Sequence, residues 1–307
     1  AFVPRKSFAA SDSIIRSYYL GHHHSALQSM VRMLNDIDVV IECRDVRVPV
    51  TSTNPKLEQA LAGKERVVVY TKADLLFETA NPLDERVEDL AQPTGSGPSP
   101  TIVFVNTYKA NTTGNVIKLL KARAAAHDSL IGIRALVVGM PNAGKSSLLN
   151  ALRSKGTKKK GTVSRTGDEP GVTRQVQTPV RVTEDDGDIP AVQVYDTPGV
   201  FVPYVADVES MLKLSLVGCV KDGIVPVETI ADYLLFRLNL HDPGLYSRWS
   251  APTNSVEDFL DNVGRKRGML GAGGEPSRLR AADWIVQQWR KGKLGRFCLD
   301  DLSEDNL

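Results

Sequence analysis

One eight-residue segment constrains the fold of this 307-residue chain more than any other. Residues 139–146 read GMPNAGKS and fit the pattern GxxxxGK[ST]. An apolar run (135–138, ALVV) precedes the segment and a leucine-rich stretch (147–152) follows it, which predicts a strand, a tight loop and a helix. Because such a loop presents backbone N–H groups and a helix N-terminus to anions, the sequence predicts a phosphate-binding loop at the end of a strand.

The members of this loop have separate expected roles. Lys145 should reach the outer phosphates of a nucleotide and take part in catalysis, and the Ser146 hydroxyl should bind Mg²⁺. Backbone N–H groups should bind the phosphates along the rest of the loop, which includes Asn142, Ala143, Gly144 and Ser147.

A second motif, DTPG, occupies residues 196–199 and ends the strand-like run 191–195. An aspartate in this place, here Asp196, holds Mg²⁺, usually through water, and the N–H of Gly199 can meet the terminal phosphate. Thr173 lies between the two motifs and should complete the magnesium shell and contact the terminal phosphate. The three together predict a nucleotide site.

A third motif, TKAD, follows the strand-like run 66–70 and indicates which base is bound. The Asp74 carboxylate can accept hydrogen bonds from N1–H and the 2-amino group of guanine, whereas adenine offers no such donor pair. The aliphatic stem of Lys72 can cover the base, while Thr71 replaces the usual Asn and removes an amide from the site. The motif therefore predicts GTP and GDP as ligands and disfavours a P-loop ATPase or kinase.

Another loop should complete the base site. The run 101–105 ends at Asn106 and Thr107, where a backbone N–H is expected to meet guanine O6.

The order of these motifs predicts the architecture. The base-reading motif precedes the phosphate loop, whereas in an ordinary small GTPase it follows the loop, so the order is typical of a circularly permuted GTPase. Strand-like runs alternate with helical stretches (38–42, 66–70, 101–105, 134–138 and 191–195), and only helical patterns follow (227–240, 256–263 and 279–290). We expect an α/β fold, with a circularly permuted P-loop GTPase sheet in residues 1–220 and an all-helical domain in residues 221–307.

Charge is concentrated in the expected helical domain. Residues 265–296 contain nine basic and two acidic side chains, and this basic block predicts an RNA-binding face. Trp284, Trp289 and Phe297 could stack on unpaired bases, but Trp289 shares a helical spacing with three apolar residues, which favours a place in the core. The lysines at 158–160 are compatible with either a solvated loop or RNA contact.

Composition is that of an intracellular globular enzyme, with 42% hydrophobic and 24% charged residues. The three cysteines are far apart and lack metal-ligand spacing, so a reducing compartment is favoured over a disulfide framework. No apolar stretch approaches the roughly 18 residues of a transmembrane helix.

In the order and sequence of these motifs, the chain resembles the ribosome biogenesis GTPase A family, most closely its mitochondrial branch. Further matching segments are GH at 21–22, DVRVP at 45–49, NP at 54–55, VGRKRG at 263–268 and LGRF at 294–297. The resemblance implies a GTP hydrolase that assists assembly of the large ribosomal subunit, binds its rRNA and ribosomal proteins in the GTP state and is released on hydrolysis. A GTP-gated RNA-binding scaffold with little turnover is the alternative.

The resemblance also bears on catalysis. Val200 stands where many GTPases have a water-orienting glutamine, which implies slow intrinsic hydrolysis, and similar proteins depend on K⁺ and on the ribosome. Asn142 matches the position that helps hold K⁺, and His22 matches an N-terminal histidine proposed to take the missing catalytic role. Here three histidines occupy 22–24, so the identity of the active ring stays open, as does a solvated turn.

The expected location follows from the resemblance and from the first 18 residues, which hold three bases, four serines and one acid. These residues lean toward organelle targeting but lack a clear amphipathic face, and the resemblance implies mitochondria more firmly. The expected place is the matrix, with peripheral association at the inner membrane left open and the cytoplasm as the alternative. We expect a monomer when the protein is not on the ribosome.

Overall fold

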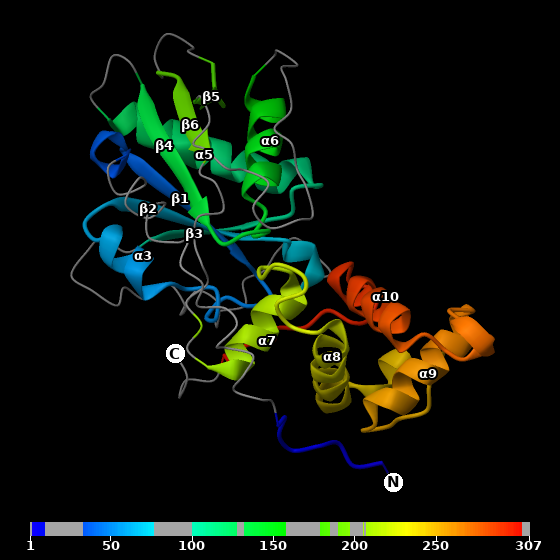
Figure 1. Ribbon diagram of the computed structural model, residues 1–307. Helices are drawn as coiled ribbons and strands as arrows, with labels where there is room; N and C mark the ends of the chain where they lie inside the picture. The colour runs from blue at the N-terminus through cyan, green and yellow to red at the C-terminus, as the bar shows by residue number, and fades with distance from the viewer. Residues whose placement is uncertain are drawn as a thin grey trace. The chain divides into compact units, whose positions relative to one another are not determined.

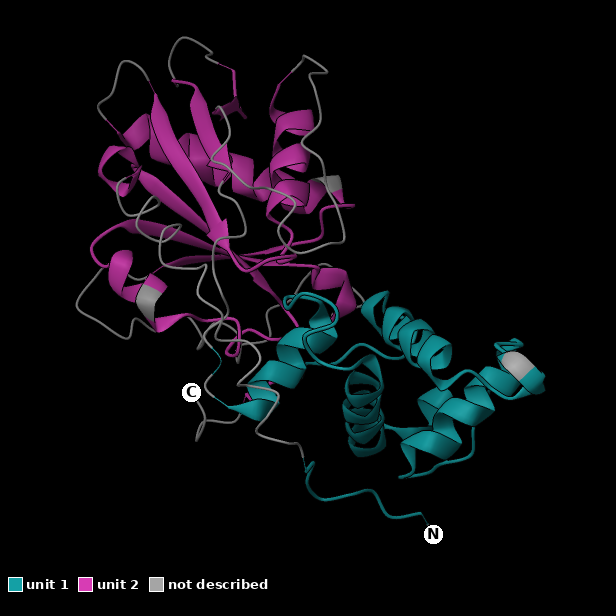
Figure 2. Cartoon of the chain, in the orientation of Figure 1, with its two compact units in different colours: residues 1–20, 205–299 teal, residues 21–204, 300–307 magenta. Residues whose placement is uncertain are grey.

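A computed structural model describes residues 2–9, 33–76, 100–127, 132–157, 179–184, 190–196, 205 and 207–302. Contacts divide the chain into two units (Figure 2). The sheet unit comprises Gly21–Tyr204 and Asp300–Leu307, and the helical unit comprises Ala1–Leu20 and Val205–Leu299. This division differs from the predicted ranges 1–220 and 221–307, because the helix α7 (Val208–Val217) and residues 1–20 group with the helical unit and residues 300–307 with the sheet unit.

The sheet unit is built on six strands in the order β3-β2-β1-β4-β6-β5 (Figure 1). Five strands are parallel, and the short β5 pairs with β6 in the antiparallel direction. The strands are β1 (Val39–Asp45), β2 (Glu65–Thr71), β3 (Thr101–Val105), β4 (Ile133–Gly139), β5 (Val180–Arg181) and β6 (Val192–Asp196). All five predicted strands are confirmed, and only the two-residue β5 was not foreseen.

The strand order shows the permutation directly. β4, the strand that leads into the phosphate loop, lies between β1 and β6. Strands that precede it in the chain extend the sheet on one side, and strands that follow it extend the other side. The registers pair Asp45 with Thr71, Cys43 with Gly139 and Val137 with Asp196. The carboxyl ends of β1, β2, β4 and β6 therefore meet at one edge of the sheet, where ligands bind in open α/β folds.

Apolar side chains explain why these strands are central. Every residue of β1 is buried, which is the pattern of a parallel strand that is covered on both faces. Val40, Leu136 and Val138 pack against Leu57 and Leu61, the latter two in and just after α3 (Pro55–Ala60). The helices α5 (Ala110–Ala126) and α6 (Lys145–Gly156) contact each other and also β3, β4 and β6.

The helical unit contains four principal helices among the described residues, and α10 contacts the other three. They are α7 (Val208–Val217), α8 (Val227–His241), α9 (Val256–Arg267) and α10 (Arg278–Arg290), with short 3-10 turns at Pro243–Tyr246 and Ala272–Gly274. The three predicted helices are confirmed. Trp289 is 2% exposed, as its spacing predicted, and Phe297 is also buried, so neither ring is available to a base.

The chain returns to the sheet unit after α10. The Asp300 carboxylate accepts hydrogen bonds from the N–H groups of Val50 and Thr51, both at 2.8 Å, and Leu302 packs against Val46 and Tyr70. In sequence, the helical unit is thus bracketed by two parts of the sheet unit. Within the described ranges, no helix is both long enough and apolar enough to cross a membrane.

Candidate nucleotide site

The phosphate loop has the predicted form of strand, tight turn and helix. β4 ends at Gly139 and α6 begins at Lys145, after Gly144 with φ of 85°. A Cβ on Gly139, whose φ is 139°, would lie 2.3 Å from the Cys43 carbonyl oxygen. Asn142 also has a positive φ of 55°. Glycine at 139 therefore allows the loop to pass close to β1, and the turn directs the loop toward the start of α6.

Lys145 lies over the loop that precedes it. Its Nζ donates to the carbonyl oxygens of Gly139 and Met140 at 3.0 and 2.6 Å, and the residue is only 7% exposed. A phosphate group can replace these neutral acceptors with a charged one, which makes a stronger hydrogen bond. The ammonium group is therefore held where the phosphates are expected.

Asp196 and Ser146 meet at the end of β6. The Ser146 hydroxyl donates to Asp196 Oδ2 at 3.2 Å, and Asp196 is fully buried. Burial raises the pKa of the Asp196 carboxyl above its usual value, although Lys145 and the Ser146 hydrogen bond act in the opposite direction. The other oxygen, Oδ1, has no hydrogen-bond partner in the described parts of the chain. A buried carboxylate with an unused oxygen beside a hydroxyl is a donor set that suits a hard cation, so these residues fit Mg²⁺.

At the base-reading end, Lys72 has a left-handed backbone conformation and precedes the 3-10 turn η2 (Ala73–Leu75). Its Nζ donates to Asp45 Oδ2 at 2.8 Å, which fixes the direction of its aliphatic stem. Asp74 is partly exposed, and no hydrogen-bond or ion-pair partner of its carboxylate is found among the described residues. Both residues lie at the carboxyl end of β2, beside the end of β1.

The anchor of Lys72 is a buried ion cluster that the sequence reasoning did not identify. Arg47 donates to Asp45 from Nε at 2.9 Å, from a terminal nitrogen at 2.7 Å and from its backbone N–H at 3.1 Å. Burial alone would raise the pKa of Asp45, but the charges of Arg47 and Lys72 outweigh burial and hold this pKa well below its usual value. The only signal in the sequence was the DVR segment, which had served to establish the resemblance.

Thr71 connects the base-reading strand to the phosphate loop. Its hydroxyl oxygen lies 2.8 Å from the carbonyl oxygen of Ala143 and 3.2 Å from that of Arg44. A Cβ on Gly144 would lie 3.2 Å from the Thr71 side chain. The threonine that replaces the usual Asn therefore contacts the loop directly, and the absence of a side chain at Gly144 leaves room for this contact.

The loop after β3 narrows the choice of the group that meets guanine O6. The N–H of Asn106 donates to Thr112 Oγ1 at 3.1 Å, and the N–H of Tyr108 donates to Asn106 Oδ1 at 2.9 Å. The N–H of Lys109 donates to the Asn106 carbonyl at 2.9 Å. Asn106 therefore stabilises the loop. Among residues 106–109, the N–H of Thr107 is the one for which no acceptor is found in the described chain, so it is the candidate donor to guanine O6.

Three predicted site residues, His22, Thr173 and Gly199, lie outside the described residues, as do the lysines at 158–160. The structure therefore brings together the remaining predicted residues at the end of the sheet. These residues lie at or just after the carboxyl ends of the parallel strands β2, β3, β4 and β6.

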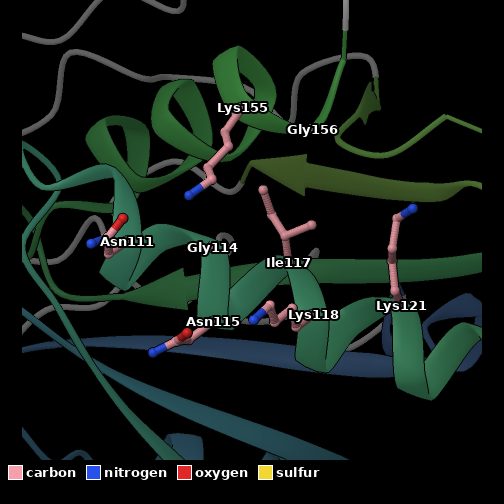
Figure 3. A pocket seen from close by; sticks show the side chains of 8 residues that line it. All are labelled: Asn111, Gly114, Asn115, Ile117, Lys118, Lys121, Lys155 and Gly156. Atoms are coloured by element: carbon pink, nitrogen blue, oxygen red, sulfur yellow. The ribbon is translucent and has the colours of Figure 1, made fainter.

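A separate hollow of about 480 Å³ lies between α5 and the end of α6 (Figure 3). It is lined by Asn111, Gly114, Asn115, Ile117, Lys118, Lys121, Lys155 and Gly156. Lys155 extends from α6 toward α5, and a Cβ on Gly114 would lie 2.6 Å from its Nζ. The lining contains none of the predicted nucleotide-binding residues, so this hollow is distinct from the nucleotide site.

Comparison with known proteins finds related GTPases. The family model described as "50S ribosome-binding GTPase" matches residues 134–265. Mitochondrial GTPase 1 of Schizosaccharomyces pombe is 38% identical, with 100% of this chain and 95% of that protein covered. Ribosome biogenesis GTPase A of Priestia megaterium is 31% identical, with 94% and 97% covered.

Similarity to solved structures concerns the fold. The crystal structure of GNP-bound YlqF from T. maritima matches with a TM-score of 0.61 and 24% identity, covering 91% of this chain and 99% of that one.

The chain is also 32% identical to mitochondrial ribosome-associated GTPase 1 of Mus musculus, with 96% and 93% covered. The protein therefore belongs to the family of circularly permuted GTPases that includes mitochondrial GTPase 1 and ribosome biogenesis GTPase A.

Proposed function

We propose that this protein hydrolyses GTP as an assembly factor for the large subunit of the mitochondrial ribosome, binds rRNA in the GTP state and is released on hydrolysis. The observation that carries the proposal is the pairing of Ser146 with Asp196 at 3.2 Å beside the ammonium group of Lys145. Thr71 bonds to the same loop and links it to the base-reading strand. Phosphate, metal and base recognition thus belong to one site.

Different residues of this site bind the phosphates, the base and the metal ion. Lys145 and the backbone N–H groups of Asn142, Ala143, Gly144, Ser146 and Ser147 bind the phosphates. Asp74 and Lys72 read and cover guanine, and the N–H of Thr107 donates to O6. Ser146 and Asp196, with Thr173 and the N–H of Gly199, form the end of the site nearest the terminal phosphate. Mg²⁺ would be held by Ser146, Thr173 and Asp196, and it supplies positive charge to the phosphate oxygens.

Hydrolysis by the isolated protein is slow in this proposal. Val200 has no group that orients water, so another group must do so, and His22 takes this role. Asn142 contributes to a K⁺ site, and the cation adds positive charge near the phosphates. The large subunit stimulates turnover by completing this arrangement.

Location and partners follow from family membership. The names of the relatives in Schizosaccharomyces pombe and Mus musculus refer to mitochondria, and the name of the mouse protein also refers to the ribosome. We place this protein in the mitochondrial matrix, as a monomer when it is not bound to the large subunit. The helical unit, with its basic block, supplies the contact with rRNA.

Phosphate release in K⁺ and in Na⁺, each with and without purified large subunits, tests the proposed reaction. We expect multiple turnovers that are fastest with both K⁺ and large subunits and slow when either is missing. Less than one phosphate released per protein under every condition would instead favour a GTP-gated scaffold.

Exchange of Asp74 for Asn should change base preference. The variant should bind GTP more weakly and xanthosine triphosphate more tightly, because xanthine carries a carbonyl where guanine has its 2-amino donor. A swing of at least about 100-fold in the ratio of the two dissociation constants is expected, as buried hydrogen-bonding groups change from paired to unpaired. Fluorescence titration with both nucleotides measures it, and an unchanged preference for GTP would place base reading elsewhere.

A further inference from the structure

Contacts inside the helical unit occupy two arginines of the basic block. Arg278 forms a two-point ion pair with Asp261, at 2.8 and 2.9 Å. Arg290 donates to the carbonyl oxygens of Ser215 and Leu216, at 2.8 and 2.9 Å. These two guanidinium groups stabilise the unit itself, and high local positive charge alone therefore does not identify the residues that face RNA.

Two other arginines lie against tryptophan rings. Trp249 and Trp284 pack edge to face, with ring centroids 5.4 Å apart and an interplanar angle of 83°. The guanidinium of Arg248 lies 3.7 Å from the centroid of Trp249, and that of Arg267 lies 4.8 Å from the centroid of Trp284. We call these four residues the Arg–Trp stack. It joins the turn after α8, the last turn of α9 and the middle of α10.

The Arg–Trp stack is anchored to the unit while its cations remain accessible. Trp249 is 6% exposed and Trp284 is partly buried, whereas Arg248 and Arg267 are exposed. Lys266 donates from Nζ to the carbonyl oxygen of Arg248 at 3.0 Å, which ties the end of α9 to the turn. The backbone that carries Arg248 and Trp249 is therefore attached to the end of α9.

Neither arginine of the stack has an ion pair with a carboxylate in the described parts of the chain. Contact with a ring face leaves the N–H groups of a guanidinium available at its edge, and it restricts the motion of a side chain that would otherwise lose much entropy on binding. Restricted, unpaired guanidinium groups are suited to planar two-point recognition of phosphate. The pairing of Arg278 with Asp261 shows the contrasting case in the same unit.

We infer that the Arg–Trp stack is a phosphate-binding site for RNA, in which Arg248 and Arg267 each bind a backbone phosphate and Trp249 and Trp284 position them. This inference rests on the proposed function, because it identifies the residues through which the helical unit contacts rRNA. It adds Arg248, which lies outside the basic block at 265–296, and it removes Arg278 and Arg290 from the predicted contact.

The test measures the affinity of the full chain, loaded with a non-hydrolysable GTP analogue, for purified large subunits and for protein-free large-subunit rRNA over a range of KCl concentrations. Arg248→Ala and Arg267→Ala should each weaken both interactions by about fivefold at physiological salt and lower the slope of log affinity against log salt by about 0.7 to 0.9. The double variant should lose about 25-fold. Arg278→Ala is the matched control, since it removes the same charge from the same unit, and it should change affinity less than about twofold.

A charge-neutral variant separates positioning from simple electrostatics. Trp284→Leu should weaken RNA binding severalfold while the salt slope stays as in the wild type, because the number of cations is unchanged but Arg267 loses its support. Trp284→Phe should restore most of the affinity, since it supplies a ring face again. Thermal unfolding and GTP affinity identify any variant that is misfolded.

The outcomes distinguish the inference from the function on which it rests. If the wild type binds large subunits and rRNA but the two arginine variants match Arg278→Ala, the Arg–Trp stack is not the site and the proposed function stands. If the arginine variants lose affinity for whole subunits only, the stack contacts a ribosomal protein and the inference is wrong. If the wild type binds neither ligand, the proposed function fails as well.

Discussion

Replacement of Lys145 with alanine should weaken GTP binding by at least about 100-fold, because a hydrogen bond to a charged group contributes about 1.5–3 kcal/mol and the ammonium has more than one phosphate oxygen to bind. Lys145 is 7% exposed and is already directed at the loop, so its charge is delivered with little reorganisation. Titration with a fluorescent GTP analogue measures the loss, and circular dichroism checks that the sheet unit stays folded.

Lys155→Ala is the matched control for this prediction. Lys155 lies on the same helix as Lys145, is exposed and lines the hollow between α5 and α6 rather than the phosphate loop. Its removal changes the net charge equally and should leave GTP affinity within about twofold of the wild type. Equal affinities for the two variants would mean that the loop does not bind the nucleotide.

Asp45→Asn should lower the free energy of unfolding of the sheet unit by about 3–5 kcal/mol, because it removes the charged acceptor that Arg47 and Lys72 share in a buried ion cluster. The side chains of Asp45 and Arg47 are 0% and 3% exposed, so water cannot readily replace the lost partner. The same change frees Lys72 from its 2.8 Å contact and should weaken GTP binding as well. Urea unfolding and nucleotide titration measure the two effects.

Glu65→Gln supplies the comparison within the same unit. Glu65 pairs with Arg123 at 2.7 Å, but both side chains are 36% exposed, so the loss should be below about 1 kcal/mol. A loss for Asp45→Asn as small as that for Glu65→Gln would contradict the buried-cluster account.

The contribution of Asp45 to the free energy of unfolding should decrease as the pH falls. Its pKa in the folded protein lies below the value of about 4 in the unfolded chain, so between these values the unfolded state binds more protons. The stability that Asp45 contributes is therefore fully present above about pH 4 and is lost as the pH falls toward the folded-state pKa. The difference between wild type and Asp45→Asn should be constant near neutral pH and shrink in strong acid, as urea unfolding at several pH values would measure.

Features that depend on neighbouring residues were predicted from the sequence. The strands were visible as apolar runs, and the helices α8, α9 and α10 as 3.6-residue periodicities, because burial selects the same spacing wherever such an element packs. The phosphate loop was visible because its glycines and Lys145 must follow one another in the chain. The order of the motifs was sufficient to predict the permuted sheet.

Other features depend on contacts between residues far apart in the chain, and these came only from the tertiary structure. From the sequence, Thr71 only replaces the usual Asn and lacks its amide. In the structure its hydroxyl oxygen lies 2.8 Å from the carbonyl oxygen of Ala143, 72 positions away. The ion pair between Asp45 and Lys72 forms because β1 and β2 are paired, and α7 belongs to the helical unit through its contacts with α8 and α10.

The basic block shows the same distinction most directly. Composition predicted a cationic surface in the helical unit but treated all its bases alike. In the folded chain Asp261 lies beside Arg278 and pairs with its guanidinium. The guanidinium of Arg267 lies over the Trp284 ring instead and has no carboxylate partner among the described residues. The sequence alone therefore determined the fold, the nucleotide motifs and the sign of the charge. Only the tertiary structure decided which charges are available to a ligand, because availability depends on which side chains long-range packing brings together.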